Sequence, residues 1–532
     1  MRTKVQLLFM LCAQALYANN IQVSGGSLVD IDLASSTAGV QFSVSWENGW
    51  RTGSAPGNWD AAWLFVKFRR ADTGVWQHAR LAGDAQHSAP AGSVLSTGLL
   101  TPGAAFDPTV NYGVGAFLHR SENGVGAFTA NDVVLRWNYG QNSIGFGDIA
   151  EVKVFAVEMV YVPQGSFWVG DGGAGPGTGV APAGRFIAGG TTNSPFLITT
   201  EGAIDVANTT GALWGMSTTG NSTIGAVGTL PAAFPKGFQA FYCMKYEVSQ
   251  QQWVDFLNTL TRSQQNGQTA SNLSPGVVSV TNRYVMSNSS TVLARNGIRC
   301  DAAIDAELPI EFYCDLNGDG VGGGGSDGQW VACNYLIWSQ LASFMDWSGL
   351  RPMTELEFEK ACRGAIAPVA HEFAWGSAGV RSWNYNGTAL GTNSEGVSNP
   401  ETGSNGNAIH SGALLISGLQ APGRVGLFAG PATTRIRSGA SYYGAMELSG
   451  NMPERAVTVG RAAGRLFNGT HGDGNLSSWP ISWPAGAGEG IGMRGGNYPN
   501  SASFMMVSDR FSAALIGGGV SSFGGRGVRT AP

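Results

Sequence analysis

The stretch from 338 to 364, WSQLASFMDWSGLRPMTELEFEKACRG, is the part of this chain whose fold its residues constrain most. Apolar residues recur at helical spacing on both sides of Gly349, which predicts two short helices joined by a tight turn. The second helix begins at Thr354, because Thr354 and Glu357 can satisfy each other's free backbone N–H groups as a capping box. Gly364 then ends it. The apolar stripes are Trp338, Leu341, Ala342 and Met345 in the first helix, and Phe358, Ala361 and Cys362 in the second.

The composition is typical of a folded, loop-rich and β-rich extracellular protein. Charged residues make up 13% of the 532 residues, and there are 79 Gly and 16 Trp. The charged share is about half the ordinary value, and Gly is about twice as frequent as usual. The length suits two or three domains. A net charge of −5 excludes a general electrostatic attraction for nucleic acid.

The N-terminus predicts export. Arg2 and Lys4 precede an apolar run from Val5 to Leu16, with small residues at Ala13, Ala15 and Ala18, as in a secretory signal peptide, which we expect to occupy 1–18. The residues before Cys12 do not fit a lipoprotein signal. No later stretch has the roughly 20 apolar residues that span a bilayer. We therefore expect a secreted or cell-surface protein without a transmembrane segment.

Residues 19–156 predict an antiparallel β-sandwich. Apolar residues alternate with polar or small ones from Val40 to Trp46, and further runs of this kind are bounded by Gly, Pro, Asn or Asp. These runs are WLFVKFRR, VWQHARL, GVGAFLHR, DVVLRWNY and VKVFAVEMVYV. The sandwich is also rich in tryptophan, which either fills its core or forms a platform for sugar rings. The tryptophans concerned are Trp46, Trp50, Trp59, Trp63, Trp76 and Trp137.

The remainder of the chain resembles the sulfatase-modifying-factor family, which includes the formylglycine-generating enzyme. The resemblance rests on ordered blocks: FYCMKYEVSQQQWVDFLN, LRPMTELEFE, EFAWG, GAMELSGNMPE, RGGNY and RGVR. It implies a loop-rich, C-type-lectin-like α+β domain over 157–532, with insertions near 170–235 and 261–329. Loops this long in a compact domain are usually functional. The resemblance also marks Arg494, Arg510, Arg526 and Arg529 as framework residues, whose guanidinium donors bind carbonyls and carboxylates.

The chemistry of the resembled enzymes is not supported by the residues of this chain. Those enzymes oxidise a substrate cysteine with copper held by two cysteines, and the corresponding positions here are Asn500 and Met505. Neither can supply the thiolate that holds Cu(I), so we expect no copper. An oxidase that uses another metal site stays open as an alternative.

A calcium loop is predicted in the second insertion, with the alternative that it is a plain Asx-rich turn. Oxygen-bearing side chains stand at alternate positions and Gly320 follows them, as in the first half of an EF-hand. The acid expected at position twelve is Ser326, and Asp327 comes one residue later. The predicted ligands are Asp315, Asn317, Asp319 and Val321. The resemblance implies a second calcium site at Asn451 and Glu454, against a purely structural Asn turn.

Five cysteines follow the predicted signal peptide: Cys243, Cys300, Cys314, Cys333 and Cys362. In an exported protein one disulfide is plausible, and Cys300 with Cys314 is the nearest pair in sequence. Cys243 and Cys362 are expected to be buried as small apolar residues.

The sequence thus favours a secreted, non-catalytic surface protein that self-associates in a filament, sheath or surface layer, or recognises other components of a bacterial surface. Two alternatives remain at this point. One is a metal-dependent oxidase of the resembled family, and the other is a carbohydrate-binding surface protein with a glycan as its partner.

Overall fold

Strand β3 (Asp60–Arg70) organises the N-terminal half because both of its faces are buried. Leu64 and Phe68 point into the interior of a β-sandwich. Trp63 and Phe65 alternate with them and point to the opposite face, where they join a larger core with residues of the C-terminal half. The Phe65 ring meets Trp347 edge-on, with ring centroids 5.0 Å apart. Successive side chains of a strand point to opposite faces, so one strand serves two cores.

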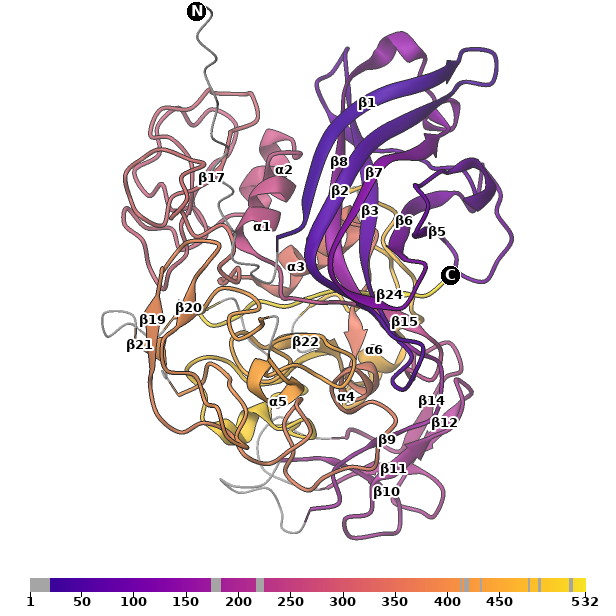
Figure 1. Ribbon diagram of the computed structural model, residues 1–532, viewed down its shortest axis with the longest axis vertical. Helices are drawn as coiled ribbons and strands as arrows, with labels where there is room; N and C mark the ends of the chain where they lie inside the picture. The colour runs from indigo at the N-terminus through magenta and orange to yellow at the C-terminus, as the bar shows by residue number, and fades with distance from the viewer. Residues whose placement is uncertain are drawn as a thin grey trace, which may run out of the picture.

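The computed structural model describes residues 20–173, 183–216, 224–411, 421–430, 433–476, 479–486, 489–515 and 520–532, and the backbone of 414–415. The predicted signal peptide at 1–18 lies outside these residues. The fold is mainly β-sheet with few helices, as expected (Figure 1).

Two antiparallel sheets form the sandwich. The first has the order β1–β2–β7, and the second has the order β24–β15–β8–β3–β6–β5 with β4 paired to β3. The period-two runs predicted as strands are confirmed. Besides β3, the two sheets contain β1 (Gln22–Asp32), β2 (Thr37–Arg51), β4 (Trp76–His78), β5 (Ser93–Leu99), β6 (Gly113–Arg120), β7 (Gly124–Trp137), β8 (Ile149–Val162), β15 (Phe241–Met244) and β24 (Val528–Thr530).

The sandwich and the following region share a sheet. The expected boundary at 156 falls inside β8, whose second half pairs with β15 from Met159↔Met244 to Val162↔Phe241. Strand β24, at the end of the chain, then pairs with β15. The apolar alternation of β8 continues through this boundary, so the strand does not stop there.

Three of the six tryptophans of the sandwich fill cores, which confirms that interpretation for them. Trp46, Trp63 and Trp137 are fully buried. Trp59 is partly buried between the Arg51 guanidinium, 4.5 Å from the ring centroid, and a stacked tyrosine. Trp50 differs from these, because it lines a groove described below.

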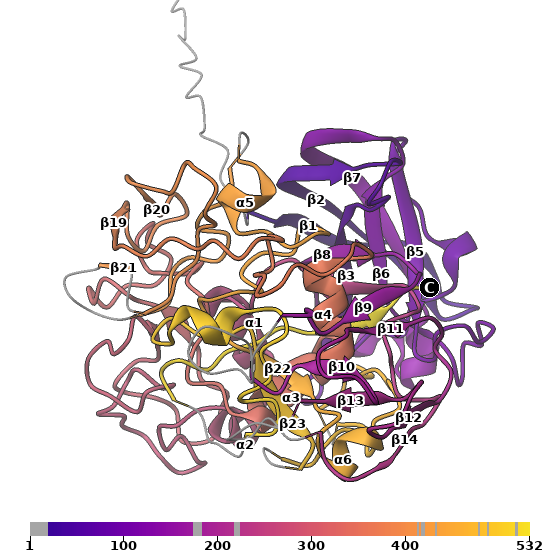
Figure 2. The same cartoon turned by 90° about the horizontal axis from the view of Figure 1, so that it is seen from below.

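The predicted insertion near 170–235 contains more regular structure than its Gly, Ser and Thr content indicated. Four of its short strands form one sheet, β10–β13–β12–β14, and β11 pairs with β9, which lies just before the insertion. These strands lie at the lower end of Figure 1, and Figure 2 shows β9 beside helix α4 (Glu355–Arg363). Three-residue strands are too short to show a period. They are β9 (Phe167–Val169), β10 (Phe186–Ala188), β11 (Phe196–Ile198), β12 (Ile204–Val206), β13 (Leu213–Gly215) and β14 (Gly228–Leu230).

The two helices predicted from 338 to 364 are confirmed as α3 (Trp338–Trp347) and α4. The Thr354 backbone N–H donates to the Glu357 carboxylate at 3.0 Å, and the Glu357 N–H donates to the Thr354 hydroxyl at 3.2 Å. Both helices are buried on almost every side rather than along one stripe. The buried carboxylates of α4 therefore need partners. Glu355 is paired with Arg494 and Arg510, and Glu357 with Arg351.

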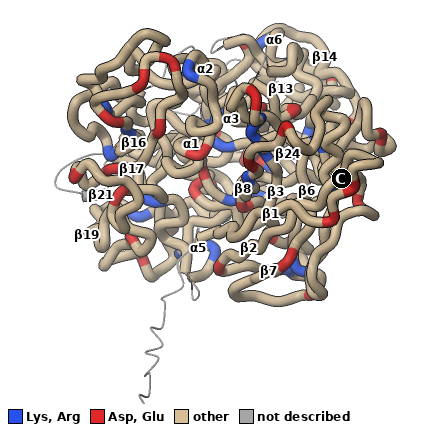
Figure 3. The backbone as a smooth tube through the Cα atoms, turned by 90° about the horizontal axis from the view of Figure 1, so that it is seen from above, with Lys and Arg blue, Asp and Glu red and all other residues tan. Residues whose placement is uncertain are grey.

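The other helices are α1 (Gln250–Leu257), α2 (Arg262–Gly267), α5 (Arg435–Ser438) and α6 (Ala462–Arg465), with 3-10 turns at Asp84–Gln86, Tyr139–Asn142, Phe146–Asp148 and Ala502–Met505. The remaining strands are β16 (Ile298–Arg299), β17 (Tyr313–Cys314), β18 (Met353–Thr354), β19 (Tyr385–Thr388), β20 (Gly396–Val397), β21 (Leu414–Leu415), β22 (Glu454–Val457) and β23 (Ile491–Arg494). No helix among the described residues is long and apolar enough to cross a bilayer. Figure 3 shows how sparsely charged residues are spread along the chain.

Candidate metal centre

The predicted calcium loop leaves β17 directly and turns tightly through its own side chains. The Asn317 side-chain oxygen accepts from the Asp319 N–H at 2.9 Å, and an Asp319 oxygen accepts from the Val321 N–H at 2.8 Å. Gly320 has a φ of +87°, a conformation that residues with a side chain rarely adopt. The Asx turns of the alternative interpretation are thus present. They are also the turns that bring the oxygens of this loop together.

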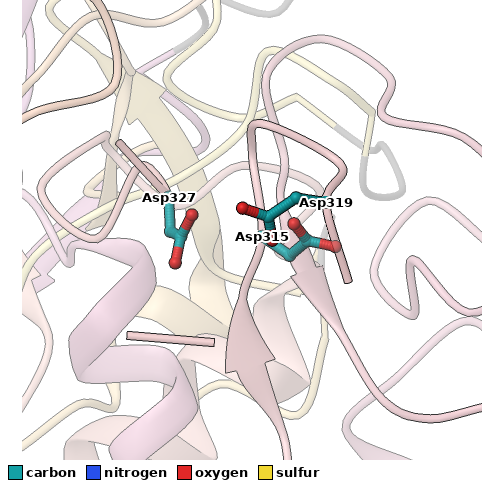
Figure 4. A group of neighbouring side chains, drawn as sticks. All are labelled: Asp315, Asp319 and Asp327. Carbon is teal, nitrogen blue, oxygen red and sulfur yellow. The ribbon is translucent and has the colours of Figure 1, made fainter. Parts of the chain in front are cut away.

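Asp327 joins this loop in space. One carboxylate oxygen from each of Asp315, Asp319 and Asp327 can be chosen so that all three lie within 4.8 Å of one another, and this is the only such group of acidic, His or Cys ligands among the described residues (Figure 4). Sequence spacing alone left Asp327 one residue beyond the EF-hand position. The turn from 321 to 326 closes that gap. The Leu316 N–H donates to the Asp327 carbonyl at 3.1 Å, which holds the two ends of the loop together.

Among the residues that the structure describes, the three carboxylates have one cationic partner. Arg299, from the short strand β16, forms an ion pair with Asp315. Asp327 is fully buried, and one of its oxygens accepts from the Gly324 N–H at 2.6 Å. The other oxygen has no partner among the described residues. Burial is the main cause that raises the pKa of Asp327, and the neighbouring Asp319 and Asp315 raise it further. A bound cation would offset both effects.

The ligand set indicates which ions this site suits. All three side chains offer carboxylate oxygen, which hard cations such as Ca²⁺, Mg²⁺ and Mn²⁺ prefer. The nearest cysteine in sequence, Cys314, is buried, and burial raises the pKa of its thiol. A thiolate for a soft metal is therefore not supplied here. The Asn317 amide nitrogen faces Asp319 and Ser326 at 3.0 and 3.2 Å, so its oxygen is the atom left for a ligand role.

In the second predicted calcium pair, Asn451 and one oxygen of Glu454 have protein partners, while the other Glu454 oxygen is buried without a partner among the described residues. The Asn451 amide donates to Glu247 at 2.5 Å, and its oxygen accepts from the Gly423 N–H at 2.9 Å. Glu454 accepts from the Arg526 Nε at 2.7 Å. Asn451 has a φ of +56°, as a turn requires. These contacts fit the structural alternative, in which both residues belong to a buried network of carboxylates around Arg526.

The positions of the copper cysteines hold Met505 and Asn500, which supply no thiolate. Met505 is fully buried in an apolar cluster with Phe373 and Trp375. Asn500 is part of a turn, in which its side-chain oxygen accepts from the Asn497 N–H at 3.2 Å.

The predicted disulfide between Cys300 and Cys314 is not formed, and all five described cysteines are free and buried. The strand register explains this, because Ile298 rather than Cys300 lies opposite Cys314. Burial also raises the pKa of the Cys243 thiol to about 12 and that of Cys300 to about 11, so these groups stay protonated at neutral pH.

The framework arginines occupy buried positions, as predicted. Arg494 donates to Glu355 at 3.0 Å and to Glu359 at 2.8 Å, and Arg510 donates to Glu355 at 2.7 Å. Arg529 instead binds the backbone carbonyls of Gly349 and Leu99. These contacts join α4, the 494–510 segment and the sandwich, which is a scaffolding task.

Sequence reasoning missed the role of Arg299. It lies in a two-residue strand that no periodic signal marks, and only the pairing of Arg299 with Tyr313 brings it beside Asp315.

No protein-family model matches the chain, and no curated protein is similar enough to be matched with it.

Proposed function

We propose that this chain is a secreted, calcium-binding surface protein that acts by self-association rather than by catalysis. The observation that carries this proposal is the open edge strand β1. It lies at the edge of the β1–β2–β7 sheet, extends over eleven residues and is largely exposed. An edge strand offers a row of unpaired N–H and C=O groups to another chain.

The composition of β1 suits pairing with a second strand. Natural edge strands are usually protected by lysine, proline or a short length. β1 has no lysine or proline, and its centre is Ser24-Gly25-Gly26-Ser27. A register shift between Ser24 and Ser27 and the two aspartates Asp30 and Asp32 limit the pairing to part of the strand. The partner we propose is a second copy of this chain.

The proposal includes a C-type-lectin-like domain of the sulfatase-modifying-factor type over 157–532, without its copper chemistry. Support comes from the buried arginine framework and from the apolar and turn-forming surroundings of Met505 and Asn500. Calcium at Asp315, Asp319 and Asp327 has a structural role in this proposal, because it would tie together the ends of a Gly-rich loop. Secretion follows from the predicted signal peptide.

The experiment is light scattering and negative-stain microscopy of the purified chain without residues 1–18, in calcium and in a chelator. We expect ordered polymers or oligomers from the wild type. Ser24→Lys with Ser27→Lys should reduce them strongly, because two charges would line the open edge. The matched control is Thr192→Lys with Thr199→Lys, at exposed positions of another region. Monodisperse monomers of the wild type in both buffers would refute self-association.

A further inference from the structure

A groove of about 390 Å³ lies where the sandwich meets the C-terminal region. Its size is within the range of small-molecule sites, roughly 300–1,000 Å³. One side is formed by Asn48 and Trp50 of β2, and the other by residues from 429–430 and 433–446. The two sides are fixed to each other, since the Asn58 amide donates to the Tyr443 carbonyl at 2.7 Å. The groove is therefore part of the packed structure rather than a gap between loops.

Aromatic rings form the apolar part of the groove. Trp50 and Tyr442 are both partly buried against the same core cluster, and Tyr443 meets Tyr442 edge-on with ring centroids 5.0 Å apart. The partly exposed rings of Trp50 and Tyr442 present flat apolar faces beside polar tips, whereas Tyr443 is only 4% exposed and packs against Tyr442. Such faces suit the C–H face of a sugar ring. None of these rings belongs to the buried tryptophans of the sandwich core.

Polar groups that lack partners supply the rest of the lining. The Asn48 amide nitrogen and the Tyr246 hydroxyl are buried and have no hydrogen-bond partner among the described residues. Tyr246 is only 4% exposed. A buried polar group without a partner costs roughly 1–3 kcal/mol. Ligand oxygens would satisfy both groups.

The charges along the groove favour an anionic ligand. Two cations line it, Lys245 and Arg435, and no carboxylate does among the described residues. Lys245 is already neutralised by Asp60 at 3.1 Å and Glu158 at 3.0 Å. Arg435 has no ion pair within the described chain, and its donors reach only the carbonyls of Cys362 and Ala374. Among the residues that line the groove, Arg435 is therefore the cation that is left for a ligand carboxylate.

From these features we propose that the groove binds a sugar unit that carries a carboxylate, as in an acidic polysaccharide. Trp50 and Tyr442 would contact the apolar face of the ring, and Tyr443 would hold Tyr442 in place. Asn48 and Tyr246 would bind its hydroxyl or ring oxygens, and Arg435 would attract the carboxylate. This inference is independent of the calcium loop and of self-association through β1.

The test is isothermal titration calorimetry with a tetramer of galacturonic acid and a neutral cellotetraose of the same length, each in chelator and in calcium. We expect the wild type to bind the acidic oligomer at least tenfold more tightly than the neutral one in both buffers. Asn48→Asp should weaken binding of the acidic oligomer at least tenfold, because it places a like charge in the groove. The matched control is Asn208→Asp, an exposed position with the same change in net charge.

A second variant, Trp50→Phe, keeps an aromatic ring and protects the test against misfolding. It should weaken binding severalfold while the melting temperature stays close to that of the wild type. The proposal is overturned if neither oligomer binds the wild type, if both bind equally, or if Asn48→Asp behaves as Asn208→Asp does. Binding that requires calcium would also overturn it, because it would place the ligand at a metal rather than in this groove.

Discussion

At the scale of single residues, Asp327 decides whether the 315–327 loop is a metal site. Without a cation, its buried carboxylate has an unpartnered oxygen. With a cation that binds only the folded state, stability rises by about 2.7 kcal/mol at a concentration of 100 times Kd. Asp327→Asn should therefore abolish the calcium-induced rise in melting temperature. In chelator the same variant should be at least as stable as the wild type, since it removes a costly buried charge.

Differential scanning fluorimetry with calcium and with chelator measures both effects. Asp205→Asn, which changes an exposed carboxylate of β12, is the control and should leave the calcium response unchanged. An unaltered calcium shift in Asp327→Asn would remove this residue from the ligand set. If Asp327→Asn is less stable than the wild type in chelator, the buried carboxylate of Asp327 does not destabilise the metal-free protein.

Asp346 in α3 predicts a pH dependence of stability. It is buried, and burial, with a contribution from Asp473, raises its pKa to about 8. The ordinary pKa of an aspartate is about 3.9, so the unfolded chain binds fewer protons than the folded chain between these values. The contribution of Asp346 to stability is therefore complete below about pH 4 and is lost as the pH rises toward 8.

The variant Asp346→Asn mimics the protonated form and should escape this loss. The free energy of unfolding of the variant minus that of the wild type should be larger at pH 8 than at pH 5. The increase should be at least about 1.4 kcal/mol, the equivalent of one pKa unit. Urea denaturation at both pH values measures the difference. Buried His78, whose pKa is lowered, is common to both proteins, whereas Lys67 interacts with Asp346 and its pKa falls further in the variant. If the free energies of unfolding of the variant and the wild type differ by the same amount at pH 5 and at pH 8, the prediction is wrong.

At the scale of elements, the capping box of α4 is the best-defined local signal in the chain. Thr354→Ala removes the N-cap hydroxyl and should cost about 1 kcal/mol of stability. The cost should exceed that of Thr200→Ala, a control at an exposed residue outside any helix. Chemical denaturation of the two variants measures it. Equal stability of both would mean that the buried surroundings of α4, rather than its cap, fix the start of the helix.

The sequence predicted those elements that carry a period or a cap. The strands with apolar alternation and the two helices from 338 to 364 were found for this reason. β1 and β5 were not predicted, because Gly and Ser interrupt their alternation. Asp315, Asp319 and Asp327 could be recognised as acids near a turn. Their convergence depends on the closure of the 321–326 segment and on Arg299, which arrives from a separate strand, and no local pattern encodes that.

At the scale of the whole molecule, the shared sheet predicts that the sandwich does not fold alone. β8 is paired with β3 on one side and β15 on the other, and β24 closes that edge. The second face of β3 is buried against residues such as Phe344 and Trp347. Removal of residues after 156 would expose Trp63 and Phe65 and leave β8 truncated. An isolated 19–156 fragment should therefore aggregate or remain unfolded.

The intact chain should in turn unfold in one cooperative transition, because the pairing of β8 with β15 and a shared core join its two halves. Scanning calorimetry is the measurement, and a ratio of calorimetric to van't Hoff enthalpy near one is the expected result. If two transitions appear, the pairing of β8 with β15 does not couple the halves. In that case the 19–156 fragment should also fold alone, so the calorimetry and the fragment test the same physical claim from opposite sides.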